Sequence, residues 1–333
     1  MSSRTTTTAA TPASSPAPAP ATMRAVSPRV WGAPDVLVPV EVARPEPGLT
    51  EILVKVHAAG VNPADWKIRA AGQFGTWGDT PILGYDVSGT VEAVGPGVTL
   101  FAPGDEVFGM PRFPEQAGGY AEYVTAPARR FARKPANIDH VEAAALPLAA
   151  LTAWQGLVET AGLRAGQRVL IHAAAGGVGH LAVQIAKAYG AYVIGTARAD
   201  KHEFLRSLGA DELIDYTAVD FTEAVRDVDV VLDGVGGAYG ERSLGVLRRG
   251  GHLVTLPDPG GLPDAERARE LGVHAGWTVV EPDRHGMLEI ARLVEEGALR
   301  AEVAATFPLA RAAEAHAVGE QSRTQGKLVL TVA

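Results

Sequence analysis

The sequence of 333 residues contains no cysteine. Disulfide bonds, thiolate nucleophiles and every zinc site that needs sulfur ligands are therefore excluded. Basic residues are fewer than acidic ones. The chain has 30 lysines and arginines and 38 aspartates and glutamates, which gives a formal net charge of −8. This balance predicts no nucleic-acid partner and no attachment to an anionic membrane. The sequence also lacks an uncharged apolar run long enough to cross a bilayer, and we expect a cytoplasmic protein.

The first 22 residues consist almost entirely of serine, threonine, alanine and proline. Such a segment cannot bury enough apolar surface to offset the entropy lost on ordering. Pro16, Pro18 and Pro20 interrupt the only stretch that could serve as the apolar core of a secretory signal. We predict a disordered tail over residues 1–22 and a folded chain that begins near Met23.

In the rest of the chain, the expected pattern of secondary structure changes near residue 148. Up to residue 147, short strands are separated by glycine and proline turns, which is typical of a barrel or sandwich; the expected strands cover 51–60, 86–94, 105–108 and 120–124. From 148 to 283, strands alternate with helices, which predicts a parallel, doubly wound α/β sheet. A strand over 276–282 is expected to close this sheet. Residues 284–333 should return to the first domain.

A glycine-rich turn follows the expected strand 168–174. Ala174, Gly176 and Gly179 occupy the three positions of a G-x-G-x-x-G fingerprint, with Gly177 and Val178 between them. Glycine at these places lets the backbone approach a pyrophosphate and lets the following helix pack closely on the sheet. The helix N-terminus then offers N–H groups to the phosphates. The pattern predicts a dinucleotide site.

The end of the next strand, 191–197, indicates which dinucleotide is bound. An NAD site usually carries an acidic residue there for the ribose 2′-hydroxyl. This chain instead has Arg198 and Lys201, with Asp200 between them. Cations suit the 2′-phosphate of NADPH, so NADPH is the predicted cofactor. The plain alternative is that both cations belong to a solvated helix start.

Four segments together resemble the quinone oxidoreductase branch of the medium-chain dehydrogenase/reductase superfamily. They are HAAGVNPADWKIRAAG, GYDVSGTVEAVGPGV, LPLAALTAWQGL and HAAAGGVGHLAVQIAKAYGAYVIGTA. The resemblance implies a GroES-like β-rich catalytic domain over 23–147 and 284–333, a Rossmann NADPH-binding domain over 148–283, and a cleft between them. It also implies a homodimer, in which the edge strand 276–282 would pair with its copy.

The same resemblance bears on metal. Zinc-dependent alcohol dehydrogenases hold their catalytic zinc with a Cys and a His at places where this chain has Asn62 and Tyr85. Neither is a good zinc ligand, so the expected site is metal-free. Without a Lewis acid, the acceptor must carry its own electron sink, as a quinone or an α,β-unsaturated carbonyl does.

Further site residues are implied by the resemblance alone. Asn62 and Thr152 would lie beside the nicotinamide, and Lys201 and Tyr216 would surround the 2′-phosphate. Asn62 could instead simply start a turn, and Tyr216 could be an ordinary strand-end tyrosine. Lys67 replaces a tyrosine that some relatives have in their substrate pocket. The proton that follows the hydride would come from Tyr85, Lys67 or water.

The sequence therefore predicts a zinc-independent, NADPH-dependent reductase of quinones or α,β-unsaturated carbonyl compounds. Two alternatives stay open at this point. One is an enoyl reductase that acts on polyketide or other secondary-metabolic intermediates. The other is a non-catalytic NADPH-binding protein with a structural or partner-binding role.

Overall fold

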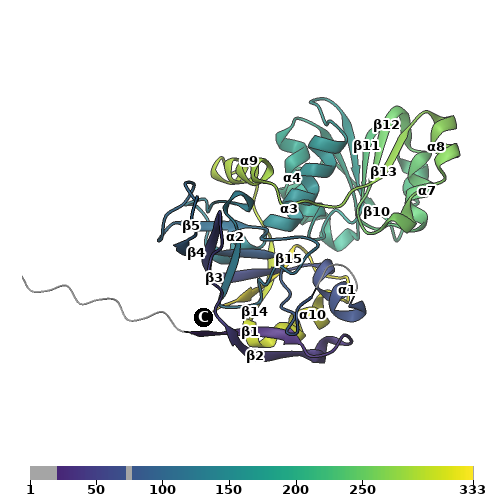
Figure 1. Cartoon of the computed structure of the whole chain (residues 1–333). Coiled ribbons are helices and arrows are strands. Elements are labelled where there is room, and N and C mark those ends of the chain that lie inside the picture. The colour runs from purple at the N-terminus through teal and green to yellow at the C-terminus, as the bar shows by residue number, and fades with distance from the viewer. Residues whose placement is uncertain (1–20, 73–76, 333) are drawn as a thin grey trace, which may run out of the picture.

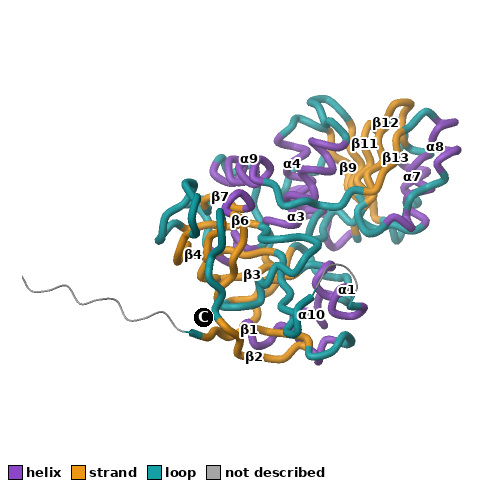
Figure 2. Tube along the Cα trace, viewed as in Figure 1, coloured by secondary structure: helices purple, strands orange, loops and turns teal. Residues whose placement is uncertain are grey.

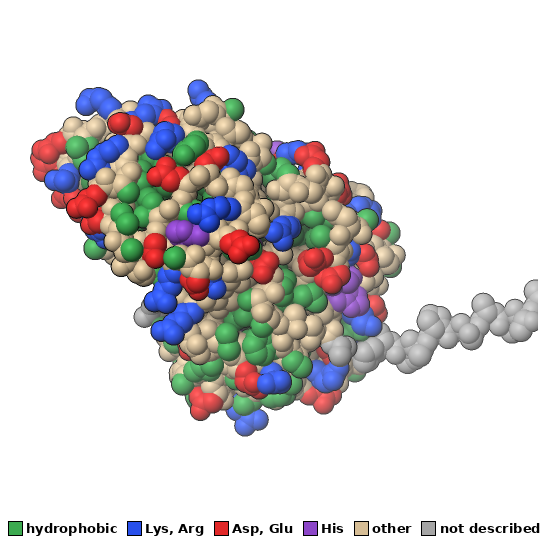
Figure 3. Space-filling model, turned by 180° about the vertical axis from the view of Figure 1, so that it is seen from behind, with side chains coloured by type: hydrophobic (Ala, Val, Ile, Leu, Met, Phe, Trp, Pro, Cys, Tyr) green, Lys and Arg blue, Asp and Glu red, His purple; other side chains and the backbone are tan. Residues whose placement is uncertain are grey.

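Two β-sheets organise the computed structural model, which describes residues 21–72 and 77–332 (Figure 1). Most of the predicted N-terminal tail lies outside the described residues. Over the described ranges, no helix is long and apolar enough to cross a membrane. Acidic and basic side chains are interspersed over the face seen in Figure 3, without a continuous basic stripe on that face.

The first sheet is parallel and has six strands in the order β10-β9-β8-β11-β12-β13. This is the strand order of a Rossmann dinucleotide-binding fold. Its strands are β8 Arg168–Ile171, β9 Tyr192–Ala197, β10 Glu212–Asp215, β11 Val228–Asp233, β12 Leu247–Thr255 and β13 His274–Trp277. Helices lie on both faces of the sheet (Figure 2); they are α4 Gly179–Ala188, α5 His202–Ser207, α6 Phe221–Ala224, α7 Ala238–Leu244 and α8 Ala265–Leu271.

The edge strand of this sheet differs from the prediction. We expected a strand over 276–282, but β13 begins at His274 and ends at Trp277. Beyond it the chain leaves the sheet, because the backbone of Glu281 pairs with the side chain of Gln155 in two 2.9 Å hydrogen bonds. Val280 is buried. Of the apolar residues that suggest a longer strand, Val280 thus serves tertiary packing, whereas Val279 is exposed.

The second sheet has seven strands and joins the two ends of the chain. Its path is β14-β15-β3-β4-β5-β7, and β6 pairs with β3. β15 runs antiparallel to β3, with Leu328 opposite Val61, so the last residues complete a sheet begun near residue 51. The strands are β3 Glu51–Val61, β4 Asp86–Val94, β5 Glu106–Gly109, β6 Tyr123–Pro127, β7 Phe131–Arg133, β14 Val303–Pro308 and β15 Lys327–Thr331.

The remaining elements surround this second sheet. A hairpin of β1 (Thr22–Pro28) and β2 (Leu37–Ala43) forms a separate two-stranded sheet. The other helices are α1 Pro63–Ala71, α2 His140–Ala144, α3 Pro147–Trp154, α9 Arg284–Glu295 and α10 Ala312–Gly319. The predicted domain boundary at 147/148 falls inside α3, and the one at 283/284 falls at the start of α9. A Rossmann sheet beside a β-rich domain confirms the predicted fold class.

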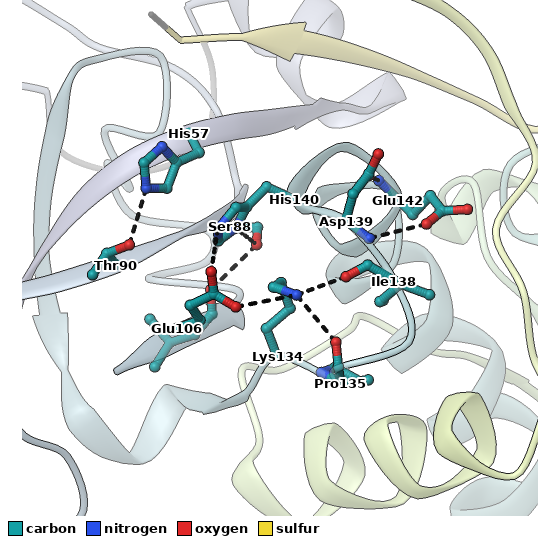
Figure 4. Close-up of polar contacts among 11 residues, drawn as sticks. His57, Ser88, Thr90, Glu106, Lys134, Pro135, Ile138, Asp139, His140 and Glu142 are labelled. Atoms are coloured by element: carbon teal, nitrogen blue, oxygen red, sulfur yellow. Dashed lines mark hydrogen bonds and ion pairs between the residues drawn. The ribbon is translucent and has the colours of Figure 1, made fainter. Parts of the chain in front are cut away.

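A polar cluster on the second sheet anchors the start of α2 (Figure 4). The imidazole of His140 lies 2.7 Å from the Ser88 hydroxyl and 3.3 Å from the Glu106 carboxylate. Lys134 also reaches Glu106, at 3.3 Å. Because α2 leads directly into α3, this cluster helps to place the helix that carries Thr152.

Candidate functional site

A cavity of about 620 Å³ is lined by residues of the β-rich domain and by residues of the Rossmann domain. One side is formed by α1 and by α3. The other is formed by the glycine-rich turn after β8 and by residues that follow β12 and β13. The start of β15 also contributes. Among the described residues that line it, none is an aspartate or glutamate.

The glycine-rich turn lies at the wall of this cavity as predicted from its spacing. Gly176, Gly177, Val178 and Gly179 all line the cavity. A Cβ at Gly179 would lie 2.3 Å from the carbonyl oxygen of residue 173, so a side chain cannot be accommodated there. Ala174, the fifth predicted residue, is buried behind the turn.

This turn fits a dinucleotide. The ten-residue helix α4 starts at Gly179 and brings its N-terminus to the cavity wall. Backbone N–H groups at such an end favour phosphate. The wall has no carboxylate among its described residues that would repel an anion. A pyrophosphate could therefore be held by backbone groups of residues 176–179.

The three residues predicted to bind a 2′-phosphate lie at neighbouring strand ends. Arg198 follows β9 and Tyr216 follows β10, and the pairing of Asp215 with Ala197 brings these ends side by side. Tyr216 is 45% exposed. Lys201 lies three residues beyond Arg198, and its nearest acidic contact is Asp200 at 3.8 Å. The three side chains lie outside the lining of the cavity, and their contact with a cofactor stays a prediction.

Asn62 is buried at the start of α1 and lines the cavity. Its side-chain amide donates to Asp86 at 2.8 Å, and its amide oxygen accepts a hydrogen bond from Lys327. Its backbone N–H donates to Asp65 at 2.8 Å. Because both ends of the side chain are engaged by the protein, its orientation is determined by the protein itself.

Lys327 is a site residue that sequence reasoning missed. Its ammonium group is buried, donates to the carbonyl of Val61 at 3.0 Å and lies 3.6 Å from the Asp86 carboxylate. Burial lowers the pKa of Lys327, and the attraction of Asp86 opposes that shift. The only sequence signal was a lysine opening an apolar strand, which normally indicates an exposed position.

The same region connects the C-terminal strand to the glycine-rich turn. The backbone N–H of Gly326 donates to the carbonyl of Ala175 at 3.0 Å. A Cβ at Gly177 would lie 3.1 Å from the Lys327 side chain. The turn is therefore supported directly by residues of the second sheet.

Tyr85 does not have the position that its predicted catalytic role requires. Its side chain is buried, and its hydroxyl donates to the carbonyl of Pro114 at 3.3 Å. Its ring packs edge-on against Phe113, with centroids 4.9 Å apart. Phe113 and Pro114 line the cavity, whereas Tyr85 lies behind them. Burial also raises the pKa of the Tyr85 hydroxyl, so we correct its role to packing.

Lys67 and Thr152 both line the cavity. The Thr152 hydroxyl donates to the carbonyl of Leu148 at 2.7 Å, within its own helix. The Lys67 ammonium reaches across to the carbonyl of Pro257, on the opposite wall, at 3.5 Å. Of the three predicted catalytic residues, Asn62 and Lys67 thus reach the cavity.

Within residues 21–72 and 77–332, no group of three or more His, Asp or Glu side chains is arranged to hold a metal ion. Asn62 is instead engaged with Asp86 and Lys327, as described above. Metal independence of the activity stays a prediction.

Comparison with known proteins places these features in a wider group. Residues 48–136 match the alcohol dehydrogenase GroES-like domain, and residues 208–330 match the zinc-binding dehydrogenase family. A mitochondrial NAD(P)H oxidoreductase, RTN4IP1 of Danio rerio, is 34% identical over 85% of this chain and 84% of its own length. Because that relative is mitochondrial by name, the expected cytoplasmic location stays a prediction.

Two further relatives carry names that describe their substrates. The 2-methylene-furan-3-one reductase of Solanum lycopersicum is 42% identical over 70% of this chain and 62% of its own length. The solved structure of the quinone oxidoreductase from Coxiella burnetii superposes with a TM-score of 0.86 and is 37% identical. It covers 94% of this chain and all of its own.

Proposed function

Since this chain belongs to the medium-chain dehydrogenase/reductase superfamily, we propose that it is an NADPH-dependent reductase of quinones or α,β-unsaturated carbonyl compounds. An oxidoreductase that uses a nicotinamide cofactor is the class to which its relatives belong. One observation carries the proposal. The cavity combines a glycine-rich turn at a helix N-terminus with apolar walls and no carboxylate among its described lining residues.

The residues of the chain bind, orient and exclude water. Residues 176–179 would hold the pyrophosphate, while Asn62 and Thr152 form the wall on which the nicotinamide would rest. When bound, a nicotinamide dinucleotide supplies the hydride, and the protein contributes geometry and electrostatics. Asn62 suits this role because Asp86 and Lys327 hold its side chain in one orientation.

The choice of NADPH over NADH rests on the neighbouring ends of β9 and β10. Arg198 and Lys201 offer cations and Tyr216 offers a hydroxyl at the place where NAD enzymes carry an acidic residue. A 2′-phosphate forms charge-assisted hydrogen bonds with such groups. Arg198 and Tyr216 are exposed and Lys201 is partly exposed beside Asp200, so all three side chains are accessible to a ligand.

The proton that completes the reduction has two remaining sources. Tyr85 lies behind the cavity wall, so Lys67 and water are the remaining candidates for the proton source. Lys67 carries its proton on an ammonium at the cavity surface.

The test is NADPH consumption by the purified protein with a panel of quinones and enones, including enoyl thioesters. Turnover of simple quinones or enones supports the proposal. Turnover of enoyl thioesters alone would favour a biosynthetic enoyl reductase. Tight NADPH binding, measured by cofactor fluorescence, without turnover of any acceptor would contradict the proposal and favour a non-catalytic binding protein.

A further inference from the structure

Two lysine side chains face the cavity, and they differ in whether a carboxylate lies beside them. Among its described lining residues the charged side chains are Lys67 and Lys327. Lys327 is buried and lies beside Asp86, which offsets its charge. Lys67 belongs to an exposed position on α1, and within residues 21–72 and 77–332 its one polar contact is the neutral carbonyl of Pro257, at 3.5 Å. Its charge is therefore available to a ligand.

The wall around Lys67 is apolar and partly aromatic. Trp66 and Ile68 flank it on α1, and Phe113 and Pro114 come from the loop after β5. The opposite wall carries further apolar side chains: Leu256, Trp277, Val279 and Val280. Such walls accept a flat hydrocarbon or aromatic body, because its burial removes apolar surface from water.

From these two observations we propose that the preferred substrate carries an anionic group, such as a carboxylate, remote from its reducible double bond. Lys67 is the specificity-determining residue that binds this group. The inference rests on the proposed reductase function. The anion would replace a long contact to a neutral carbonyl with a charge-assisted hydrogen bond, which is shorter and stronger.

The arrangement across the cavity supports this role. Lys67 comes from α1 on one wall of the cavity, and Pro257 comes from the loop after β12 on the opposite wall. The contact between them therefore spans the two walls. A substrate anion at this place would be held at the junction of both walls. Water then remains as the source of the proton, because a lysine paired with an anion retains its own proton.

The experiment compares two substrates that differ chiefly in charge. 4-Phenyl-3-buten-2-one bearing a para-carboxylate is compared with its methyl ester, and the acid-to-ester ratio is compared between protein variants, so the intrinsic difference in reactivity of the two acceptors cancels. The values of kcat and KM are measured for the wild type and for Lys67→Met, Lys67→Arg and Lys67→Glu. Lys55→Met is the matched control, because Lys55 is an exposed lysine of β3 that lies outside the cavity lining.

In the wild type and in Lys55→Met, the acid should have the lower KM, by about fivefold for a partly exposed ion pair. Lys67→Met should remove that preference, Lys67→Arg should retain it, and Lys67→Glu should reverse it. An unchanged acid-to-ester ratio in Lys67→Met would overturn the proposal. So would an equal loss of kcat for both substrates, which would mark Lys67 as the proton donor. A rise in the KM for NADPH alone would assign Lys67 to the cofactor and overturn it as well.

A binding measurement separates this inference from the proposed function. Trp66 and Trp277 line the cavity, so quenching of tryptophan fluorescence can report binding of the saturated acid and the saturated ester to the NADP⁺-loaded protein. If neither enone is reduced, the proposed function fails for this substrate class, while tighter binding of the saturated acid still supports the role of Lys67. Equal binding of acid and ester would refute that role whether or not the enones are reduced.

Discussion

The ammonium nitrogen of Lys327 lies 3.6 Å from a carboxylate oxygen of Asp86, and both side chains are buried. Asp86 opens β4, and Lys327 opens β15, about 240 residues later in the chain. Asn62 bridges the pair through the two ends of its side-chain amide. The pair therefore joins the C-terminal strand to the wall of the cavity on which a nicotinamide would rest.

Replacing Lys327 by methionine should destabilise the protein strongly. The change leaves the Asp86 carboxylate buried without its cation, and breaking a buried pair costs about 3–5 kcal/mol. Urea unfolding followed by circular dichroism would measure the loss, with Lys55→Met as an exposed-lysine control. The double variant Lys327→Met/Asp86→Asn should lose less than the sum of its single variants. Strict additivity would show that the two groups do not interact.

Removing Lys201 should weaken NADPH binding selectively. A charge-assisted hydrogen bond is worth about 1.5–3 kcal/mol, or about ten- to hundredfold in affinity. Lys201→Ala should lose this factor for NADPH and leave NADH nearly unaffected, as titrations of cofactor fluorescence would show. Arg198→Ala should act in the same direction, and the double variant should nearly abolish the preference. Arg206→Ala, on the exposed side of α5, is the control. An equal loss for both cofactors would contradict the assignment.

Acid should destabilise the protein partly through His180. This buried imidazole donates from Nδ1 to the carbonyl of Gly176 at 2.9 Å and accepts at Nε2 from the N–H of Glu302 at 3.1 Å. Burial lowers the pKa of His180 from 6.5 to about 4. The unfolded chain therefore binds more protons between these values, and the free energy of unfolding falls as pH drops from about 6.5 to about 4.

The measurement for His180 is urea unfolding at several pH values between 7.5 and 4.5. His180→Gln lacks the titrating group, so its stability should depend less on pH, by at most about 1.4 kcal/mol per pH unit. Burial raises the pKa of Asp65 to about 7. Its titration therefore changes the free energy of unfolding in the opposite direction, but by the same amount in the wild type and in the variant. Parallel pH profiles for wild type and variant would argue against titration of His180.

We expect the protein to be a homodimer that pairs through β13. This strand lies at the edge of the parallel sheet, and an unpaired edge with exposed apolar residues favours association with another chain. Light scattering should give twice the chain mass of 34.7 kDa. Ala275→Glu, on the exposed edge, should shift the equilibrium toward the monomer, while Leu288→Glu, at an exposed position of α9, should not. A monomeric wild type at micromolar concentration would disprove this arrangement.

The activity should not depend on a metal ion. Asn62 and Tyr85 stand where zinc-dependent relatives are expected to have their ligands, and neither binds zinc well. Turnover should survive exhaustive treatment with a chelator, and elemental analysis should find no stoichiometric zinc. Activity that is lost on chelation and restored by zinc would overturn this expectation.

Local patterns in the sequence were sufficient for the fold class and for the glycine-rich turn. Strand and helix periods depend on near neighbours, and the spacing of Gly176 and Gly179, set between an expected strand and an expected helix, predicts a close backbone approach. The edge strand was misplaced because Val279 and Val280 are as apolar as strand residues. In the structure the strand ends at Trp277, and Glu281 pairs with the side chain of Gln155 and not with a neighbouring strand.

The environments of individual polar side chains were decided by tertiary structure. Tyr85 and Lys67 were equal candidates in the sequence, but the fold buries Tyr85 behind Phe113 and leaves Lys67 at the cavity. Nothing in the local sequence marks Lys327 as buried, and it is the pairing of β15 with β3 that places it beside Asp86. The sequence by itself therefore determined the α/β alternation and the glycine-rich turn, which depend on local spacing. Which charges are buried and which meet a ligand depends on contacts between distant segments, and only the folded chain brings those segments together.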